Sequence, residues 1–417
     1  MPAPIRPAVF VGARLVDGRS PDAIRNGVLV TDEVGRIAAV GPGTAVAAPR
    51  ELERIDATGL TILPGLIDCH VHLSLRLEPV ADQAQRSATD LVVRALQSGR
   101  EFVEAGVTTI RDAGYTPSGI KRAFAAGAFP GPRTQVSCTP LSQTGGHGDG
   151  WTPSGSVLET HVSDLPPGIA DGVDAVRGAA RLQIRAGADW IKVMASGGVL
   201  SAADTPDASQ FTVDEIRAIV DEAKAAGIKG TLAHAEGTTG IKNALRAGIT
   251  SIEHGDLIDE EGIDLMLERS VPLVPTFNIN FVLMDEARVA RGDVPPWAVE
   301  KMGYLFKRQQ VNFRHAVARG VRVAMGTDSF NGMYPPAELA YMSEFGLGPF
   351  GTIQAATNHA AELLGLSDLV GTLELGKQAD LIAVSGDPMA EPELWRDPAR
   401  IVFVMQGGRI VADRRGA

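Results

Sequence analysis

The chain has 417 residues, of which 44% are hydrophobic and 21% charged, a globular composition that excludes a disordered or fibrous protein. Its 39 Lys and Arg against 50 Asp and Glu give a net charge of −11, so neither a nucleic acid nor an anionic membrane is expected as a partner. Two cysteines are too few for a disulfide framework. No apolar stretch has the length of a signal peptide or a membrane span, so we expect a cytoplasmic protein.

Both ends of the chain are rich in short β-like runs. Residues 1–62 and 365–417 alternate apolar stretches with Gly, Asp and Pro, as strands and turns do. Two unrelated β flanks would give the same pattern, but chain ends often lie close together. We therefore predict one small β domain built from both ends.

The middle of the chain, residues 63–364, alternates β-like runs with amphipathic helical stretches. Thr212 and Glu215 form a candidate capping box before one of these helices. Eight β-like runs, each followed by a helix or a long loop, predict an α/β fold of the (β/α)8 type. The runs are 61–70, 106–114, 133–138, 189–196, 228–234, 249–254, 271–277 and 321–328, and helices are predicted at 88–106, 173–187, 212–227 and 295–320.

Side chains suited to metal binding lie at the ends of four of these runs. His70 and His72 are two residues apart after the first run, so they share a face and can bind one ion. His234 ends the fifth run, His254 the sixth and Asp328 the eighth. The C-terminal ends of barrel strands meet at one mouth, so these residues are expected to converge there.

The chemistry of these ligands favours zinc, with manganese, cobalt or nickel as alternatives, because imidazole nitrogen and carboxylate oxygen occur together. A single His-x-His pair, or one histidine in a core, is more often structural than functional. The joint occurrence of these residues at several strand ends, in one order, favours a metal centre.

Lys192 is a single cation inside the apolar run at 189–196. Burying an unpaired ammonium is costly, which leaves three physically sensible outcomes. The lysine can pair with a carboxylate, lose its proton and act as a base, or be modified. A neutral amine can add CO2 to give a carbamate, whose two oxygens can bridge two metal ions. Composition does not decide among these outcomes.

With the segments LPGLIDCHVH, AGVTTIRDAG, IKVMASGGV, AHAEG, AGITSIEHG, MGTDS and GTLELGKQADLIAV, the sequence resembles the amidohydrolase superfamily over nearly its whole length. The resemblance implies a (β/α)8 TIM barrel over 63–364 with a small β-sandwich domain from 1–62 and 365–417. GGHGD at 145–149 and IKVMASGG are similar to the binuclear branch that contains Xaa-Pro and Xaa-Arg dipeptidases, with imidazolonepropionase-like proteins and ochratoxin-type amidases as relatives. Such relatives often assemble, so a homo-oligomer is expected.

The same resemblance implies two divalent metal ions, zinc being the best suited. One ion would be held by His70, His72 and Asp328, and a more exposed one by His234 and His254. Lys192, carboxylated, would bridge both. A hydroxide bridging the metals would then attack the carbonyl, with Asp328 as general base and later general acid. His147 would contact the scissile carbonyl or the polar end of the substrate.

The resemblance favours a linear amide, peptide-like or N-acyl amino acid, as the small-molecule substrate. Dipeptidase relatives often carry Gln-Tyr where this chain has Gln210-Phe211, which mildly favours a less polar amide, a carbamate or a urea. Hydrolysis of a cyclic amide is the alternative. A non-enzymatic relative is disfavoured because every expected ligand is present, and a nucleobase deaminase because that branch usually lacks the lysine.

Substrate specificity in barrels resides in the loops after the strands. The loops at 139–171 and 277–296 are therefore expected to shape the pocket, with Trp151, Phe277, Phe281 and Met284 as an apolar wall. His161 lies in the first loop and is a further candidate for the mouth.

Overall fold

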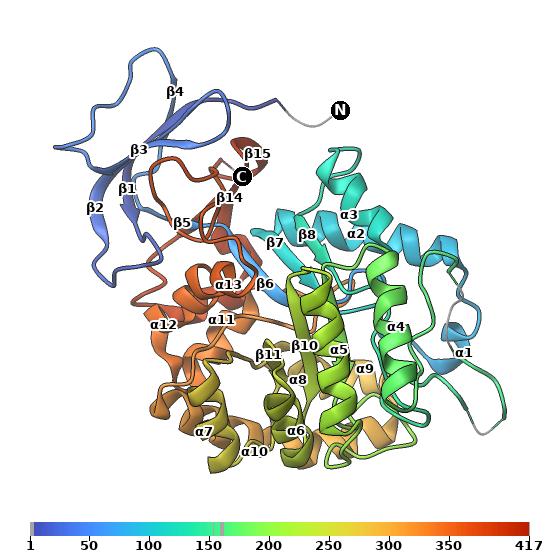
Figure 1. The fold of residues 1–417 in the computed structure, drawn as a ribbon. Coiled ribbons are helices and arrows are strands. Elements are labelled where there is room, and N and C mark those ends of the chain that lie inside the picture. The colour runs from blue at the N-terminus through green and yellow to red at the C-terminus, as the bar shows by residue number, and fades with distance from the viewer. Residues whose placement is uncertain (1–3, 153, 159–161, 417) are drawn as a thin grey trace.

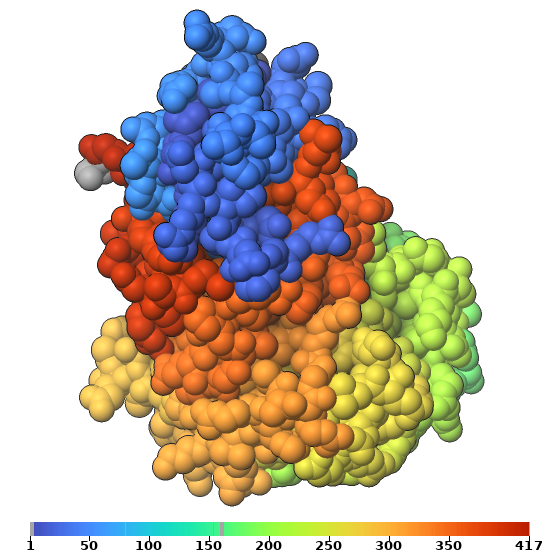
Figure 2. All heavy atoms as spheres, turned by 90° about the vertical axis from the view of Figure 1, so that its left-hand side faces the viewer, coloured from blue at the N-terminus to red at the C-terminus, as the bar shows by residue number. Residues whose placement is uncertain are grey.

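Strands from the two ends of the chain share one sheet. The computed structural model describes residues 4–152, 154–158 and 162–416. The N-terminal part supplies β1 (Ala8–Leu15), β2 (Ile24–Thr31), β3 (Ile37–Pro42), β4 (Glu53–Asp56) and β5 (Leu60–Pro64), and the C-terminal part β13 (Leu381–Ser385), β14 (Ile401–Gln406) and β15 (Arg409–Asp413). Their order is β15-β14-β13-β5-β1-β2-β3, and β4 pairs with β1. The N-terminal and C-terminal strands therefore lie together in one part of the molecule, as Figures 1 and 2 show.

The junction between the two ends is the antiparallel pair β5 and β13, in which Ile382 lies opposite Leu63. Phe10 of β1 and Phe403 of β14 pack edge to face at 5.4 Å in the hydrophobic cluster of this sheet. The described strands from the two ends of the chain form one sheet, so the β-sandwich and the domain bounds 1–62 with 365–417 stay predictions.

Two parallel sheets form the middle of the chain, among the residues that the structure describes. One contains β6 (Leu66–Val71), β7 (Val107–Asp112) and β8 (Arg133–Val136); the other contains β9 (Trp190–Met194), β10 (Gly230–Ala235), β11 (Ser251–His254) and β12 (Leu273–Val274). Seven of the eight predicted runs thus contain a parallel strand. Parallel strands require crossover connections, and helices supply most of them.

Helices follow these strands along the chain (Figure 1). α2 packs on β7, α3 on β8, α4 on β9, α5 on β9 and β10, and α6 on β10 and β11. The helices are α1 (Val80–Gln83), α2 (Ala88–Glu104), α3 (Ser118–Ala125), α4 (Val173–Arg185), α5 (Val213–Ala225), α6 (Thr238–Ala247), α7 (Glu260–Arg269), α8 (Phe277–Leu283), α9 (Glu286–Arg291), α10 (Pro296–Arg319), α11 (Ala337–Met342), α12 (Gly348–Ala355) and α13 (Asn358–Leu363). A π-helical turn, η1 (Ser343–Leu347), and two 3-10 turns, η2 (Pro392–Arg396) and η3 (Pro398–Arg400), complete the helical elements. None of the described helices is long and apolar enough to cross a membrane.

Local sequence signals set the ends of two of these helices. The Glu215 amide donates to Thr212 Oγ1 at 3.3 Å, and the Thr212 amide donates to Glu215 Oε2 at 2.7 Å, which is the predicted capping box of α5. α10 begins at Pro296 and ends before Gly320, whose φ of 93° is favourable only for glycine.

The eighth predicted run, residues 321–328, is not a regular strand. Val323 makes a single parallel bridge to Leu273, and Ser329 makes one to Val71. The amides of Thr327 and Asp328 both donate to the one carbonyl of His70 in β6, at 3.2 and 2.8 Å, so two residues face one and the regular ladder is interrupted as at a bulge. The segment nevertheless lies between β12 and β6, although the described strands do not form a closed eight-stranded barrel.

Candidate metal centre

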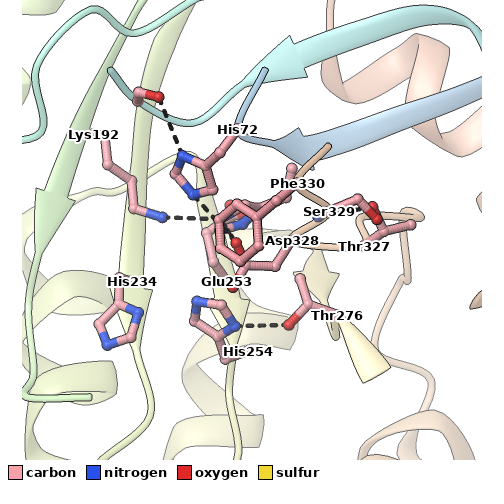
Figure 3. Close-up of polar contacts among 12 residues, drawn as sticks. His72, Lys192, His234, Glu253, His254, Thr276, Thr327, Asp328, Ser329 and Phe330 are labelled. Atoms are coloured by element: carbon pink, nitrogen blue, oxygen red, sulfur yellow. Dashed lines mark hydrogen bonds and ion pairs between the residues drawn. The ribbon is translucent and has the colours of Figure 1, made fainter. Parts of the chain in front are cut away.

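The predicted ligands come together at one end of the parallel strands (Figure 3). The rings of His70 and His72 lie 5.4 Å apart, and the His70 ring is 5.1 Å from that of His254. The rings of His254 and His234 are 4.6 Å apart, and Lys192 Nζ is 3.3 Å from His70 Nε2. Residues from four strands therefore face one small volume.

Asp328 completes this group from the segment that follows β12. Its Oδ1 lies 3.2 Å from His72 Nε2 and 3.6 Å from His70 Nε2. One ligand atom of each of these three residues falls within 4.8 Å of the others. Asp328 and His254 have φ of 51° and 70°, a left-handed conformation that non-glycine residues adopt at a cost. Such backbone strain is typical of functional sites.

His70 and His72 each have one ring nitrogen fixed by an outer partner. Nδ1 of His70 is bound to Glu253 Oε2 at 2.8 Å, and Nδ1 of His72 to the carbonyl of Gly114 at 3.1 Å. Both acceptors place the ring proton on Nδ1, which leaves Nε2 with its lone pair facing the centre. This is the arrangement of metal-binding histidines.

His234 and His254 also have one ring nitrogen bound to an outer partner, Nε2 in His234 and Nδ1 in His254. Nε2 of His234 is bound to the carbonyl of Gly197 at 3.0 Å, so its free nitrogen is Nδ1. Nδ1 of His254 is bound to Thr276 Oγ1 at 2.7 Å, so its free nitrogen is Nε2. Four histidines thus each have one nitrogen fixed and one available, and together with Asp328 this donor set fits divalent ions such as zinc.

Burial keeps the imidazoles of His70, His234 and His254 in the neutral form that binds metals. It lowers the pKa of His254 to about 3 and holds those of His70 and His234 well below the usual range. Burial alone would raise the pKa of Asp328, but the neighbouring His72, His70 and His254 lower it below its usual range. Asp328 is therefore an anion.

Lys192 is 1% exposed, in the middle of β9. Burial lowers the pKa of its ammonium to about 8, so part of the amine is neutral near pH 7. A neutral amine is the form that adds CO2. Its Nζ lies 3.3 Å from Nε2 of His70, the ring nitrogen that faces the centre.

His147 lies on the loop after β8, as predicted, and stacks on His234 with ring centroids 4.2 Å apart. Its Nδ1 is 2.8 Å from Ser201 Oγ, and its amide donates to Gln210 Oε1 at 2.9 Å. Burial lowers the pKa of His147 to about 4. Nε2 is the ring nitrogen left for a substrate.

The two segments expected to shape substrate specificity, 139–171 and 277–296, differ from the predicted loops with an apolar wall. Residues 277–296 contain α8 and α9, and Phe277 is fully buried against Phe313 at 5.0 Å, so it forms part of the core and not of a pocket wall. Phe211 is also buried in the main hydrophobic cluster. Trp151 is 55% exposed, and His161 lies outside the described residues.

Two charged residues beneath the centre were not predicted from the sequence. Glu253, which holds His70, also accepts from Arg111 at 2.9 Å, and both side chains are fully buried. Arg111 follows the uncharged residues VTTI in its strand, and Glu253 follows SI in its strand. A single charged residue within an uncharged strand is the sequence pattern that could have identified both. Asp68 accepts from Thr327 Oγ1 at 2.6 Å and so holds the segment that carries Asp328.

Comparisons with known proteins agree with this geometry. The sequence profile of the family described as "Amidohydrolase family" matches residues 61–411. Ochratoxinase from Aspergillus niger is 36% identical over 366 residues, covering 84% of this chain and 75% of that protein. Imidazolonepropionase from Rhizobium rhizogenes is 26% identical over 420 residues, covering 89% and 90%. A Xaa-Pro dipeptidase crystallised with methionine in its active site has a TM-score of 0.88 and 30% identity, covering 97% of this chain and 99% of its own.

Proposed function

Because the chain belongs to the amidohydrolase family, we propose that it cleaves a linear amide bond, peptide-like or of an N-acyl amino acid, with two divalent metal ions. The family relationship confirms the resemblance found in the sequence, and with it a hydrolytic enzyme acting on carbon–nitrogen bonds. The observation that carries the proposal is the set of four histidines, each fixed at one nitrogen and free at the other, around Asp328 and Lys192.

The proposed metal ligands divide into two sets. One set is His70, His72 and Asp328, the other is His234 and His254, and a carboxylated Lys192 would be common to both. Zinc is the metal that this donor set suits best. When bound, the two ions would lower the pKa of a shared water and polarise the scissile carbonyl.

Two residues of this chain then act on the substrate. The carboxylate of Asp328 accepts a proton from the attacking water and then donates it to the nitrogen of the leaving amine. His147 uses Nε2 toward the scissile carbonyl or the polar end of the substrate, because Ser201 already occupies Nδ1. The loop that carries His147 is held in place by Gln210.

The similarity to a Xaa-Pro dipeptidase, which covers almost the entire chain, favours the linear amide. The lower identity to imidazolonepropionase keeps a cyclic amide as the alternative, with carbamates and ureas as further candidates. The proposal also includes closure of the parallel strands into a TIM barrel over 63–364, the β-sandwich of 1–62 and 365–417, a homo-oligomer and a cytoplasmic location.

A substrate screen with metal analysis tests the proposal. The purified chain, supplied with zinc and bicarbonate, is assayed on dipeptides, N-acyl and N-carbamoyl amino acids and hydantoin-like rings. We expect turnover of linear amides, lost in His234→Ala and retained in His315→Ala, a matched change on the half-exposed surface of α10. Turnover of the rings alone would favour the cyclic alternative, and turnover of none of these compounds would refute the proposal.

A further inference from the structure

Two buried carboxylates lie beside the candidate metal centre, each two residues beyond a predicted ligand. Glu236 follows His234 at the end of β10, and Asp256 follows His254 at the end of β11; they are 5% and 3% exposed. The two segments run side by side, because the amide of Leu257 donates to the carbonyl of Glu236 at 2.9 Å. Glu236 Oε1 is 3.9 Å from the His234 ring nitrogen.

One oxygen of each carboxylate has no hydrogen-bond partner among the residues that the structure describes, namely Glu236 Oε2 and Asp256 Oδ1. Buried polar atoms in folded proteins are rarely left without a partner, and a buried carboxylate needs a compensating cation. Two such oxygens, each two residues beyond a predicted metal ligand, are placed to accept hydrogen bonds from a bound ligand.

Lys301, whose charge acts on Glu236, is already engaged elsewhere. Lys301 Nζ donates to the carbonyls of Gly198 and Ser201 at 2.9 and 2.6 Å, and lies 3.5 Å from Asp204. Asp204 in turn accepts from Gln210 Nε2 at 2.8 Å, so this third carboxylate is satisfied. Among the residues that the structure describes, no Lys or Arg forms an ion pair with Glu236 or Asp256.

A substrate amino group fits this pair of carboxylates. An ammonium carries three N–H donors and tolerates varied geometry, so two carboxylate oxygens can bind it. In an unblocked dipeptide, a single carbon separates the amino nitrogen from the scissile carbonyl, which places the amino group next to the centre.

We infer that Glu236 and Asp256 bind the positively charged amino group on the acyl side of the substrate, so that free dipeptides are preferred over N-acyl amino acids. The inference rests on the proposed function and narrows its substrate class. Loss of one charged hydrogen bond to the ammonium is expected to cost about tenfold or more in kcat/KM.

The test uses two substrates that differ only in the amino group, alanyl-phenylalanine and propionyl-phenylalanine. We expect the wild-type protein to prefer the first by about tenfold or more, and Glu236→Gln and Asp256→Asn each to shrink this preference at least several-fold. Asp207→Asn, which removes the same charge from an exposed position nearby, is expected to keep the preference unchanged. Metal content is measured for every variant.

Each contrary result has a distinct meaning. Equal use of both substrates by the wild-type protein, or an equal loss on both in Glu236→Gln, refutes the inference while the proposed function stands. A metal ion lost in Glu236→Gln also refutes it, because the carboxylates then belong to the metal centre. Hydrolysis of no linear amide at all refutes the proposed function and this inference with it.

Discussion

Glu253→Gln is the perturbation that probes the support beneath the metal centre most sharply. The carboxylate accepts from His70 Nδ1 through Oε2, and from Arg111 at 2.9 Å and Ser251 Oγ at 2.5 Å through Oε1. Glutamine has the same shape but only one acceptor oxygen. One of the two faces must therefore meet an NH2 group in place of an oxygen.

Both orientations of the glutamine are unfavourable. If its NH2 faces His70, the ring proton moves to Nε2, and that nitrogen can no longer bind an ion. In either orientation the fully buried guanidinium of Arg111 loses its counter-charge, because glutamine is neutral. The first effect is expected to weaken metal binding about 10- to 100-fold, and the second to cost about 3 kcal/mol of unfolding free energy.

Chelator competition measures the metal affinity, and urea unfolding of the metal-free protein measures the stability. Glu260→Gln is the matched control, because Glu260 also binds a histidine, His315, at 2.7 Å, but lies 67% exposed on the surface. We expect it to shift stability by less than about 0.5 kcal/mol and to leave metal affinity unchanged. A Glu253→Gln protein that matches the wild type in both assays would refute the reasoning.

Three further changes have defined outcomes. Lys192→Ala removes the shared ligand, so we expect fewer than two ions per chain and no measurable turnover; a variant that keeps both ions would exclude the bridging role. His147→Ala is expected to lower kcat about 10- to 1000-fold with metal content unchanged, and loss of metal would contradict its assignment to the substrate. Hydrogen bonds from Lys377, first, and from Thr372 lower the pKa of Glu374 to about 2. Glu374 thus contributes stability above the unfolded pKa near 4.5 that is lost as pH falls toward 2. Glu374→Gln is expected to cost roughly 1 kcal/mol at pH 7, after allowance for solvent screening, and nothing near pH 2; a cost independent of pH in urea unfolding would contradict this.

Sequence periodicity and strand-end chemistry predicted much of the fold and which histidines come together at the strand ends. His70, His72, His234 and His254 could be predicted to converge because each stands at or just beyond the end of an apolar run. Parallel strands align those ends in space. Thr212 and Gly320 show that caps also could be read locally, since their geometry involves only neighbouring residues.

Features that depend on distant partners could not be read in this way. The segment at 321–328 has strand-like composition, but two of its amides share the single carbonyl of His70 in β6, some 250 residues earlier, and this irregular pairing leaves isolated bridges in place of the expected strand. Phe277 resembles a pocket residue in sequence, yet contacts with α10 bury it. The partner of Glu253 was equally hidden, because Arg111 lies 142 positions away.

Metal analysis combined with anomalous diffraction tests the central claim most directly. The protein is reconstituted with zinc and bicarbonate, and the ions are counted and located in crystals. The account predicts two zinc ions per chain, one beside His70, His72 and Asp328 and one beside His234 and His254, with extra density on Lys192 Nζ. Fewer than one ion per chain, or ions away from these side chains, would contradict it.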